Sequence, residues 1–147
     1  DKDFFDSLHK KPVIINTSRG EVVETGAILD TLKGGKISDA VIDVWENEPN
    51  INLELLHKVY IGTPHIAGYS ADGKLNATRM TLESLCKFLN INMKIKLDIE
   101  NKNEDSSGTC TNDDILSKYN PKDDYSLLLS HPEDFEKIRG NYKLRKE

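Results

Sequence analysis

The chain has 147 residues, of which 37% are hydrophobic and 31% are charged, and its formal net charge is −5. This length predicts one domain, or one compact piece with an appendage. The negative charge argues against nucleic acid as the main partner, because a phosphate backbone requires a basic surface. The sequence contains no run of about 18 apolar residues, the length that a membrane-spanning helix requires. Cys86 and Cys110 are isolated and lack the spacing of a metal site, and little supports a disulfide between them, so a reducing cytoplasm is the simplest compartment.

The chain begins with residues that resemble the end of a helix. Phe4, Phe5 and Leu8 fall on one face of the segment 3–10, and no methionine precedes it. We therefore expect the first residue to be an internal point of a longer protein. Residues 12–16 follow as a short, continuous apolar run, which is typical of a strand buried on both faces of a sheet.

Helices and further strands then alternate. Thr25 offers an N-cap for a helix that ends at the glycine pair 34–35. A second apolar strand is expected over 37–44, a short helix around 53–56 and a third strand over 59–61. This order is the signature of a parallel, doubly wound α/β sheet.

The second half of the chain has a different pattern. Residues 70–90 have helical periodicity, with leucines forming one stripe. Residues 101–114 are polar and rich in turn formers, which indicates a linker. Residues 115–147 are amphipathic again but hold too few apolar side chains for a core of their own, so we expect them to pack against another domain or chain.

Three segments that carry chemistry follow the three predicted strands. They are Asn16–Gly20, Asp43–Pro49 and Thr63–Gly68. Because the carboxyl ends of parallel strands meet at one edge of the sheet, Arg19, an acidic side chain and His65 should be brought to the same edge. Asp43 would end an apolar strand, a costly place for a charge without a partner.

An arginine, a carboxylate and a histidine together suit the oxidation of a 2-hydroxy acid. The guanidinium matches a substrate carboxylate with two parallel hydrogen bonds. The histidine can take the hydroxyl proton as general base, and the acid can fix its tautomer. The same acid–histidine pair could serve a hydrolase, but Ser18 does not lie in a Gly-x-Ser-x-Gly turn.

The motifs INTSRGEVVETGAILDTL, AVIDVWENEP and IGTPHIAGYSADGK resemble the catalytic half of the D-2-hydroxyacid dehydrogenase family, in its order and spacing. The resemblance covers residues 1–92. It implies that Arg19 binds the substrate carboxylate, that Glu48 pairs with His65, and that His65 exchanges the hydroxyl proton. The fold expected is therefore part of a Rossmann-type sheet.

The resemblance also implies a cofactor, NAD. Asp43 would hydrogen-bond the nicotinamide carboxamide, and the backbone at Thr17 and Gly68 would lie against the nicotinamide side. No metal is implied. Tyr69 would touch the substrate, a role that belongs to the subgroup of the family that oxidises 4-phospho-D-erythronate to its 2-oxo acid in pyridoxal 5′-phosphate synthesis.

The match to that subgroup rests on DVWENEP, the following HIAGYS and GK, and the terminal FEKIRGNYKLR. It implies a homodimer and a division into three parts. Residues 1–92 would be the C-terminal half of the nucleotide-binding domain with its crossing helix, 93–114 a strand and linker, and 115–147 a small α-rich or α+β dimerisation segment. An enzyme of the glycerate or phosphoglycerate type remains an alternative.

One element of the family is absent from the 147 residues. No Gly-x-Gly-x-x-Gly loop occurs, and the pair 34–35 ends a helix instead of opening one. We therefore expect this piece alone to bind NAD poorly and not to turn over. A further alternative is a truncated, non-catalytic product that only associates with other chains through its tail.

Overall fold

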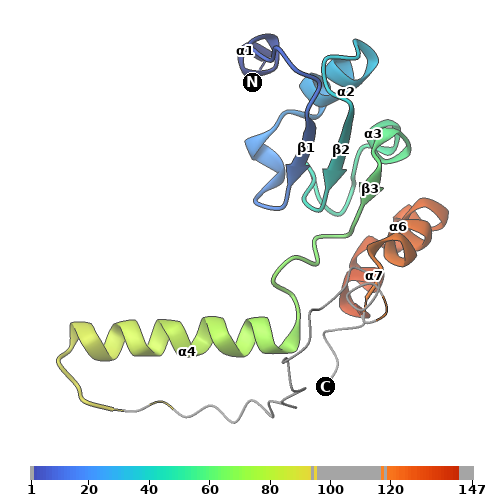
Figure 1. The fold of residues 1–147 in the computed structure, drawn as a ribbon. Helices are drawn as coiled ribbons and strands as arrows, with labels where there is room; N and C mark the ends of the chain where they lie inside the picture. The colour runs from blue at the N-terminus through green and yellow to red at the C-terminus, as the bar shows by residue number, and fades with distance from the viewer. Residues whose placement is uncertain (1, 94, 96–116, 118, 143–147) are drawn as a thin grey trace. The chain divides into compact units, whose positions relative to one another are not determined.

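The computed structural model describes residues 2–93, 95, 117 and 119–142 (Figure 1). It divides into two units, described separately: residues 1–67 with 120–142, and residues 68–119 with 143–147. The first unit contains α1 (Lys2–Asp6), β1 (Val13–Asn16), η1 (Gly20–Val22), α2 (Thr25–Lys33), β2 (Asp39–Ile42), α3 (Leu53–Lys58), β3 (Ile61–Gly62), α6 (Pro121–Ser130), η2 (Pro132–Asp134) and α7 (Phe135–Gly140). The second contains α4 (Ala71–Phe88).

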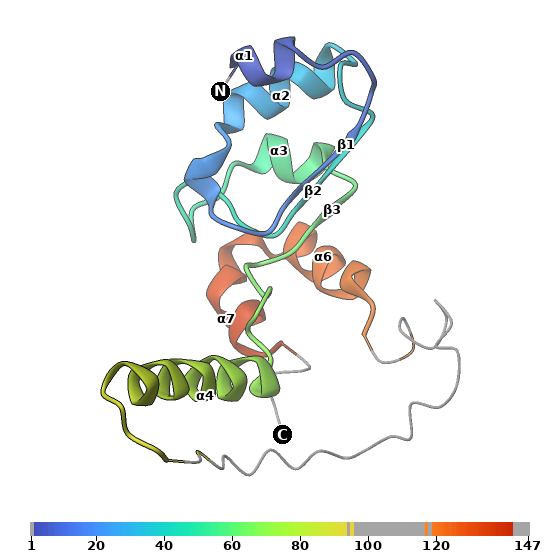
Figure 2. The same ribbon diagram turned by 60° about the vertical axis from the view of Figure 1, so that its left-hand side comes forward.

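The sheet has three parallel strands in the order β1-β2-β3. Ile15 pairs with Val41, and Val41 with Ile61. Helix α2 connects β1 to β2, α3 connects β2 to β3, and both helices lie on the same face of the sheet (Figure 2). The predicted alternation is confirmed, and the sheet is part of a Rossmann-type domain.

Strand β1 is buried on one face only. Ile14 and Asn16 lie on the face toward the helices, but Val13 is 51% and Ile15 68% exposed. The prediction of a strand buried on both faces is therefore wrong for the described residues. An all-apolar run requires two covered faces, and the helices of the first unit cover one.

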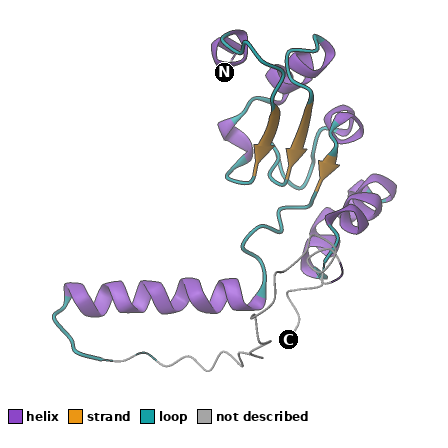
Figure 3. Ribbon diagram, in the orientation of Figure 1, coloured by secondary structure: helices purple, strands orange, loops and turns teal. Residues whose placement is uncertain are grey.

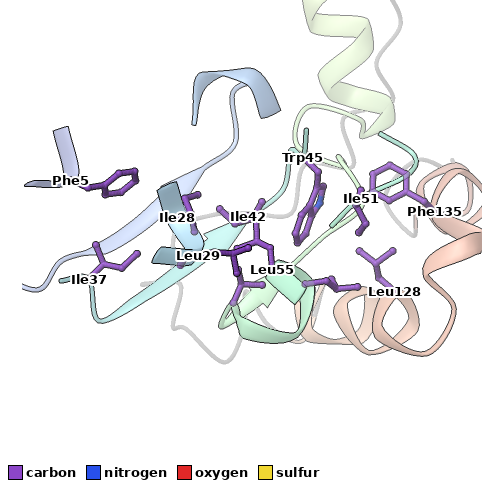
Figure 4. Close-up of a cluster of buried hydrophobic side chains, with 13 residues drawn as sticks. Phe5, Ile28, Leu29, Ile37, Ile42, Trp45, Ile51, Leu55, Leu128 and Phe135 are labelled. Atoms are coloured by element: carbon purple, nitrogen blue, oxygen red, sulfur yellow. The ribbon is translucent and has the colours of Figure 1, made fainter. Parts of the chain in front are cut away.

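The core joins the sheet to the C-terminal helices (Figure 4). Its buried side chains include Phe5, Ile28, Leu29, Ile42, Trp45, Leu55, Leu128 and Phe135. Leu128 of α6 and Phe135 of α7 are fully buried, and each such side chain contributes about 1.5–3 kcal/mol. The hydroxyl oxygen of Tyr125 lies 2.9 Å from the carbonyl oxygen of Leu56 and 2.8 Å from that of Val59. Residues 120–142 therefore obtain their core by packing on residues 1–67.

Several predicted boundaries moved, among them the second strand, which was expected over 37–44 and covers Asp39–Ile42. Thr25 is the first residue of α2, and Glu24 is the N-cap. The Thr25 amide donates to Glu46 Oε2 at 2.6 Å. The helix start is thus capped by a distant carboxylate. The third strand begins at Ile61 instead of residue 59, because Val59 caps the end of α3 through its amide.

Helix α4 confirms the helix expected over 70–90. Ser70 is its N-cap, with Oγ accepting from the Gly73 amide at 3.3 Å. Met80 and Phe88 are more than half exposed. In the described parts of the chain the C-terminal segment is helical (Figure 3). The strand and linker expected over 93–114 lie outside the described residues, apart from 93 and 95. Among the described helices, none is long and apolar enough to span a bilayer.

Candidate active site

The three predicted loops follow the carboxyl ends of the three strands and are joined through their backbones. The Asp43 amide donates to Asn16 O at 3.0 Å, and the Thr63 amide donates to Ile42 O at 2.9 Å. The His65 amide reaches Asp43 O at 2.8 Å. Each loop therefore continues the register of its strand onto one edge of the sheet, where α/β folds form their sites.

Glu48 and His65 form a close pair at this edge. His65 Nδ1 lies 2.7 Å from Glu48 Oε2, and the two side chains are 20% and 19% exposed. An ionised carboxylate can only accept, so Nδ1 carries the hydrogen and Nε2 of the neutral ring keeps its lone pair. A pair with this geometry can fix the tautomer of a general base, and the catalytic roles of Glu48 and His65 stay predictions.

Glu48 is itself held in place. Its Oε1 accepts a hydrogen bond from the Trp45 amide at 2.8 Å, so both carboxylate oxygens are engaged. The turn between these residues places Asn47 at φ +62°, in the left-handed region that asparagine tolerates better than most residues. Local chain geometry therefore directs Glu48 toward His65.

Asp43 is buried and has three protein partners. Its Oδ1 accepts from Thr63 Oγ1 at 2.6 Å and from the Ile66 amide at 2.8 Å, and Oδ2 accepts from the Ala67 amide at 3.0 Å. These bonds compensate the burial of the charge. The carboxylate organises the loop around His65, and its predicted contact with a nicotinamide amide stays a prediction.

The backbone of His65 has φ +53°, in the left-handed region that is unfavourable for a non-glycine residue. Its amide donates to two carbonyl oxygens, with the nitrogen 2.8 Å from Asp43 O and 3.1 Å from Thr63 O. Its own carbonyl oxygen accepts from Arg139 Nε at 3.1 Å. The surrounding hydrogen bonds therefore hold the residue in a conformation that it would otherwise avoid.

The loop after β1 is ordered by Asn16 but leaves Arg19 exposed. The side-chain nitrogen of Asn16 donates to Arg19 O at 3.1 Å. Its side-chain oxygen accepts from the backbone amide and the hydroxyl of Ser18 at 3.2 and 3.0 Å. Arg19 Nη1 donates to Ser18 O at 2.7 Å, and Thr17 is exposed as well. Neither Arg19 nor Thr17 contacts the Glu48–His65 pair through any hydrogen bond of the described residues.

Gly20 allows the first two loops to approach each other. A Cβ at this position would lie 2.1 Å from Trp45 O and 2.6 Å from the Glu46 amide nitrogen. Trp45 is buried, and its Nε1 donates to Thr63 O at 2.9 Å. Trp45 thus contacts the loops on both sides of its own.

Gly68 and Tyr69 belong to the second unit and are described with it. Gly68 has φ +74°, a conformation that side chains rarely adopt. The Lys74 ammonium lies 4.0 Å from the centroid of the Tyr69 ring, a cation–π contact. The predicted roles of both residues stay predictions.

Sequence reasoning missed four residues that support the site: Asn16, Gly20, Thr63 and Arg139. Asn16 and Thr63 are polar residues at the ends of apolar strands, a signal that the sequence carried. Gly20 follows Arg19 in a turn and could have been noticed as a close approach. No local pattern indicates Arg139, because its partner His65 is 74 residues away.

The donor groups suit part of a dinucleotide site. Among the described residues, no group of three or more His, Cys, Asp or Glu side chains could hold a metal ion. Thr17 and Asp43 lie at the strand edge where a nicotinamide would be held, but the 147 residues contain no glycine-rich loop for the diphosphate. The residues present therefore fit the nicotinamide end alone.

A comparison with protein families matches residues 1–67 to the family described as D-isomer specific 2-hydroxyacid dehydrogenase, NAD binding domain. Residues 1–67 belong to this family. The match contains the three strands and the Glu48–His65 pair, so the family resemblance of the motifs is confirmed.

Several curated proteins named erythronate-4-phosphate dehydrogenase are similar to the whole chain. That of Bacteroides thetaiotaomicron is 54% identical over 155 residues, and that of Bacteroides fragilis 57% identical over 148 residues. Both alignments include 100% of this chain and 42% of the relative. The protein of Marinobacter nauticus is 34% identical, over 96% of this chain and 41% of its own length. The chain therefore spans about two fifths of the length of these 2-hydroxyacid dehydrogenase relatives.

Proposed function

We propose that the protein carrying this chain oxidises 4-phospho-D-erythronate to the 2-oxo acid with NAD, and that this chain supplies its acid–base residues. The observation that carries the proposal is the 2.7 Å contact between His65 Nδ1 and Glu48 Oε2 at the carboxyl edge of the sheet. This arrangement leaves Nε2 as the atom that takes the proton from the substrate hydroxyl.

Each predicted residue has a distinct task in this reaction. Glu48 stabilises the imidazolium that forms when His65 takes the proton. Arg19, exposed on the neighbouring loop, binds the substrate carboxylate with two parallel hydrogen bonds. Tyr69 contacts the substrate. Thr17, Asp43 and Gly68 would hold the nicotinamide of NAD, which would accept the hydride from C2 of the substrate.

The choice of substrate is supported by the relatives' names, since those similar over the whole chain are named erythronate-4-phosphate dehydrogenases. Enzymes of the same family that act on glycerate or phosphoglycerate would use the same arginine, glutamate and histidine. The discriminating feature is the group at the far end of the substrate. Comparing kcat/KM for 4-phospho-D-erythronate, phosphoglycerate and glycerate therefore separates these functions.

We also propose that this chain does not turn over by itself. It has no glycine loop for the diphosphate, and its strand β1 exposes Val13 and Ile15 beside an apolar hollow of about 420 Å³ that Phe4 and Val22 also line. An exposed apolar surface of this kind favours contact with further protein. We infer that the part of the relatives that this chain does not match supplies the protein that covers this surface.

We propose a homodimer formed through residues 115–147, in the cytoplasm. Leu127 on α6 is 51% exposed, and with Ile138 it lines a hollow of about 410 Å³ between α6 and α7. The two apolar side chains remain outside the buried core that contains Leu128 and Phe135, and polar or charged residues line the rest of the hollow: Asp124, His131, Asp134, Lys137 and Asn141. Cys86 is a buried free thiol, as expected in a reducing compartment.

The test is the rate of NADH formation with 4-phospho-D-erythronate, measured on the full-length protein and on residues 1–147. Turnover by the full-length protein and none by the piece is expected. Turnover with a different 2-hydroxy acid alone would correct the substrate and keep the reaction. Activity of the isolated piece would overturn the account of the cofactor site, and an inactive full-length protein would overturn the proposed function.

A further inference from the structure

The side chain of Arg139 reaches the main chain of His65. Nε donates to the His65 carbonyl oxygen at 3.1 Å, across 74 residues of sequence. We propose that Arg139 is a positioning residue: it fixes the backbone of His65, and through it the imidazole, so that the C-terminal segment takes part in ordering the active site. The catalytic consequence rests on the proposed function above, whereas the structural claim does not.

The conformation of His65 makes such a contact consequential. A non-glycine residue at φ +53° is strained relative to the right-handed region, because its Cβ crowds the backbone. The amide side is held by Asp43 and Thr63, whose carbonyl oxygens lie within 3.1 Å. On the carbonyl side, the described hydrogen bond comes from Arg139. Removing it leaves the strained peptide fixed at its amide end.

Arg139 donates from an anchored support. Helix α7 begins with Phe135, which is fully buried, and Tyr142 just beyond its end is buried too. The Arg139 side chain is 21% exposed, and its Nη1 lies 3.5 Å from Glu136 Oε1 on the same helix. A half-buried guanidinium on a packed helix loses little entropy when it donates, unlike a long side chain that moves freely in solvent.

The geometry favours positioning over direct contact with the substrate. Nε is the donor nearest the helix within the planar guanidinium, and it is occupied by a main-chain carbonyl. The ring of His65 is oriented separately by Glu48 through Nδ1. Arg139 therefore sets where the imidazole sits, while Glu48 sets how the ring is turned.

The experiment compares Arg139→Ala and Arg139→Lys in the full-length protein with the matched control Lys137→Ala. Lys137 lies on the same helix but is 71% exposed and pairs with Asp134 at 3.0 Å. The readouts are kcat and KM for the 2-hydroxy acid, the urea midpoint, and the ring resonances of His65 by NMR, assigned with His65→Asn. Arg139→Lys keeps the charge but replaces the planar fork with a point donor.

For Arg139→Ala we expect kcat to fall by about 10- to 100-fold, because a small displacement of a reacting group has this effect. KM should change by less than about twofold, because a lost interaction with the bound substrate would appear there. The His65 ring resonances should shift. Arg139→Lys should restore part of kcat, and Lys137→Ala should match the unsubstituted protein in every readout.

Other outcomes would contradict the positioning role of Arg139, or would test the proposed function separately from it. Unchanged kcat and unchanged His65 resonances in folded Arg139→Ala would overturn it. A raised KM with kcat intact would mean that Arg139 binds the substrate instead. If Arg139→Ala does not fold, Arg139→Lys carries the comparison. If the unsubstituted protein oxidises no 2-hydroxy acid, the proposed function fails, and the His65 resonances alone decide whether Arg139 positions that residue.

Discussion

The loops after β3 and β1 present their functional side chains in opposite ways. His65 is bonded at its amide, its carbonyl oxygen and its ring, and Asp43 secures the amides that follow it. Arg19 is exposed, and its guanidinium rests on the carbonyl oxygen of the preceding residue. The contrast agrees with the proposed reaction, in which His65 exchanges a proton and needs a fixed position, whereas Arg19 binds a charged substrate that would itself order the side chain.

The largest effect is expected when the ring of His65 is removed. His65→Asn keeps a residue that tolerates the left-handed backbone, so the loop should survive while the base is lost. We expect kcat of the full-length protein to fall by about 10²- to 10⁴-fold, measured as NADH formation. The exposed His57 provides the matched control, His57→Asn, which should be fully active. Retained activity in His65→Asn would assign the base to another residue.

The loop that contains His65 is held in part by Arg139, which lies on the C-terminal helices. Leu128→Ala should lower the free energy of unfolding by about 2–5 kcal/mol, because a fully buried leucine leaves a cavity. Leu127→Ala, next to it but 51% exposed, should change it by less than about 0.5 kcal/mol. Urea denaturation measures both. Equal effects of the two variants would contradict the packing of α6 on the first unit.

The close approach of the first two loops can be tested with glycines. Gly20→Ala places a methyl group 2.1 Å from the Trp45 carbonyl oxygen, so we expect a loss of about 1–3 kcal/mol from overpacking. Gly26→Ala in α2 meets nothing within 4 Å and should stabilise the protein by up to about 1 kcal/mol. Thermal denaturation of the pair would show opposite signs. A neutral Gly20→Ala would mean that the loops can separate.

The exposed side of the comparison predicts an effect on binding without an effect on folding. Arg19→Met should lower kcat/KM for the 2-hydroxy acid by about 10- to 100-fold, the value of one charge-assisted bidentate contact of 1.5–3 kcal/mol. Because Arg19 is exposed, the urea midpoint should stay unchanged. Lys11→Met removes another exposed cation and should leave the kinetics alone. A large loss of stability in Arg19→Met would show that the guanidinium is structural.

The smallest effect concerns Glu46, which caps α2. Hydrogen bonds from Thr25, from its side chain and then its amide, hold the pKa of Glu46 below its ordinary value of 4.5. The stabilisation is therefore fully present above the unfolded pKa and is lost as pH falls through the folded pKa. Glu46→Gln should cost about 0.5–2 kcal/mol near neutral pH.

Urea curves at several pH values check the prediction for Glu46. The gap between Glu46→Gln and the unsubstituted protein should close as the solution is acidified, because both then lack the charge. Glu21→Gln, an exposed residue nearby, should show no gap at any pH. A gap that persists in acid would mean that Glu46 acts by packing and not by its charge.

Much of the fold could be predicted because it depends on local patterns. The alternation of apolar runs with helical spacing located three strands and the helices between them, and the loops after the strands contained Arg19, Glu48 and His65. The start of β3 differed from the prediction because the Val59 amide donates to the end of α3 and is not part of the strand. The open face of β1 went unnoticed because an apolar run reports what a strand requires, not what covers it.

The sequence by itself determined the fold class, the family and the identity of the residues at the strand ends, because periodicity and short motifs act over a few residues. Only the tertiary structure decided which of those residues touch. It showed that Asp43 orders the loop around His65, that Glu46 caps a helix whose first residue is 21 positions away, and that Arg139 reaches His65 across 74 residues. Such contacts depend on how helices pack on a sheet, and no local pattern encodes that.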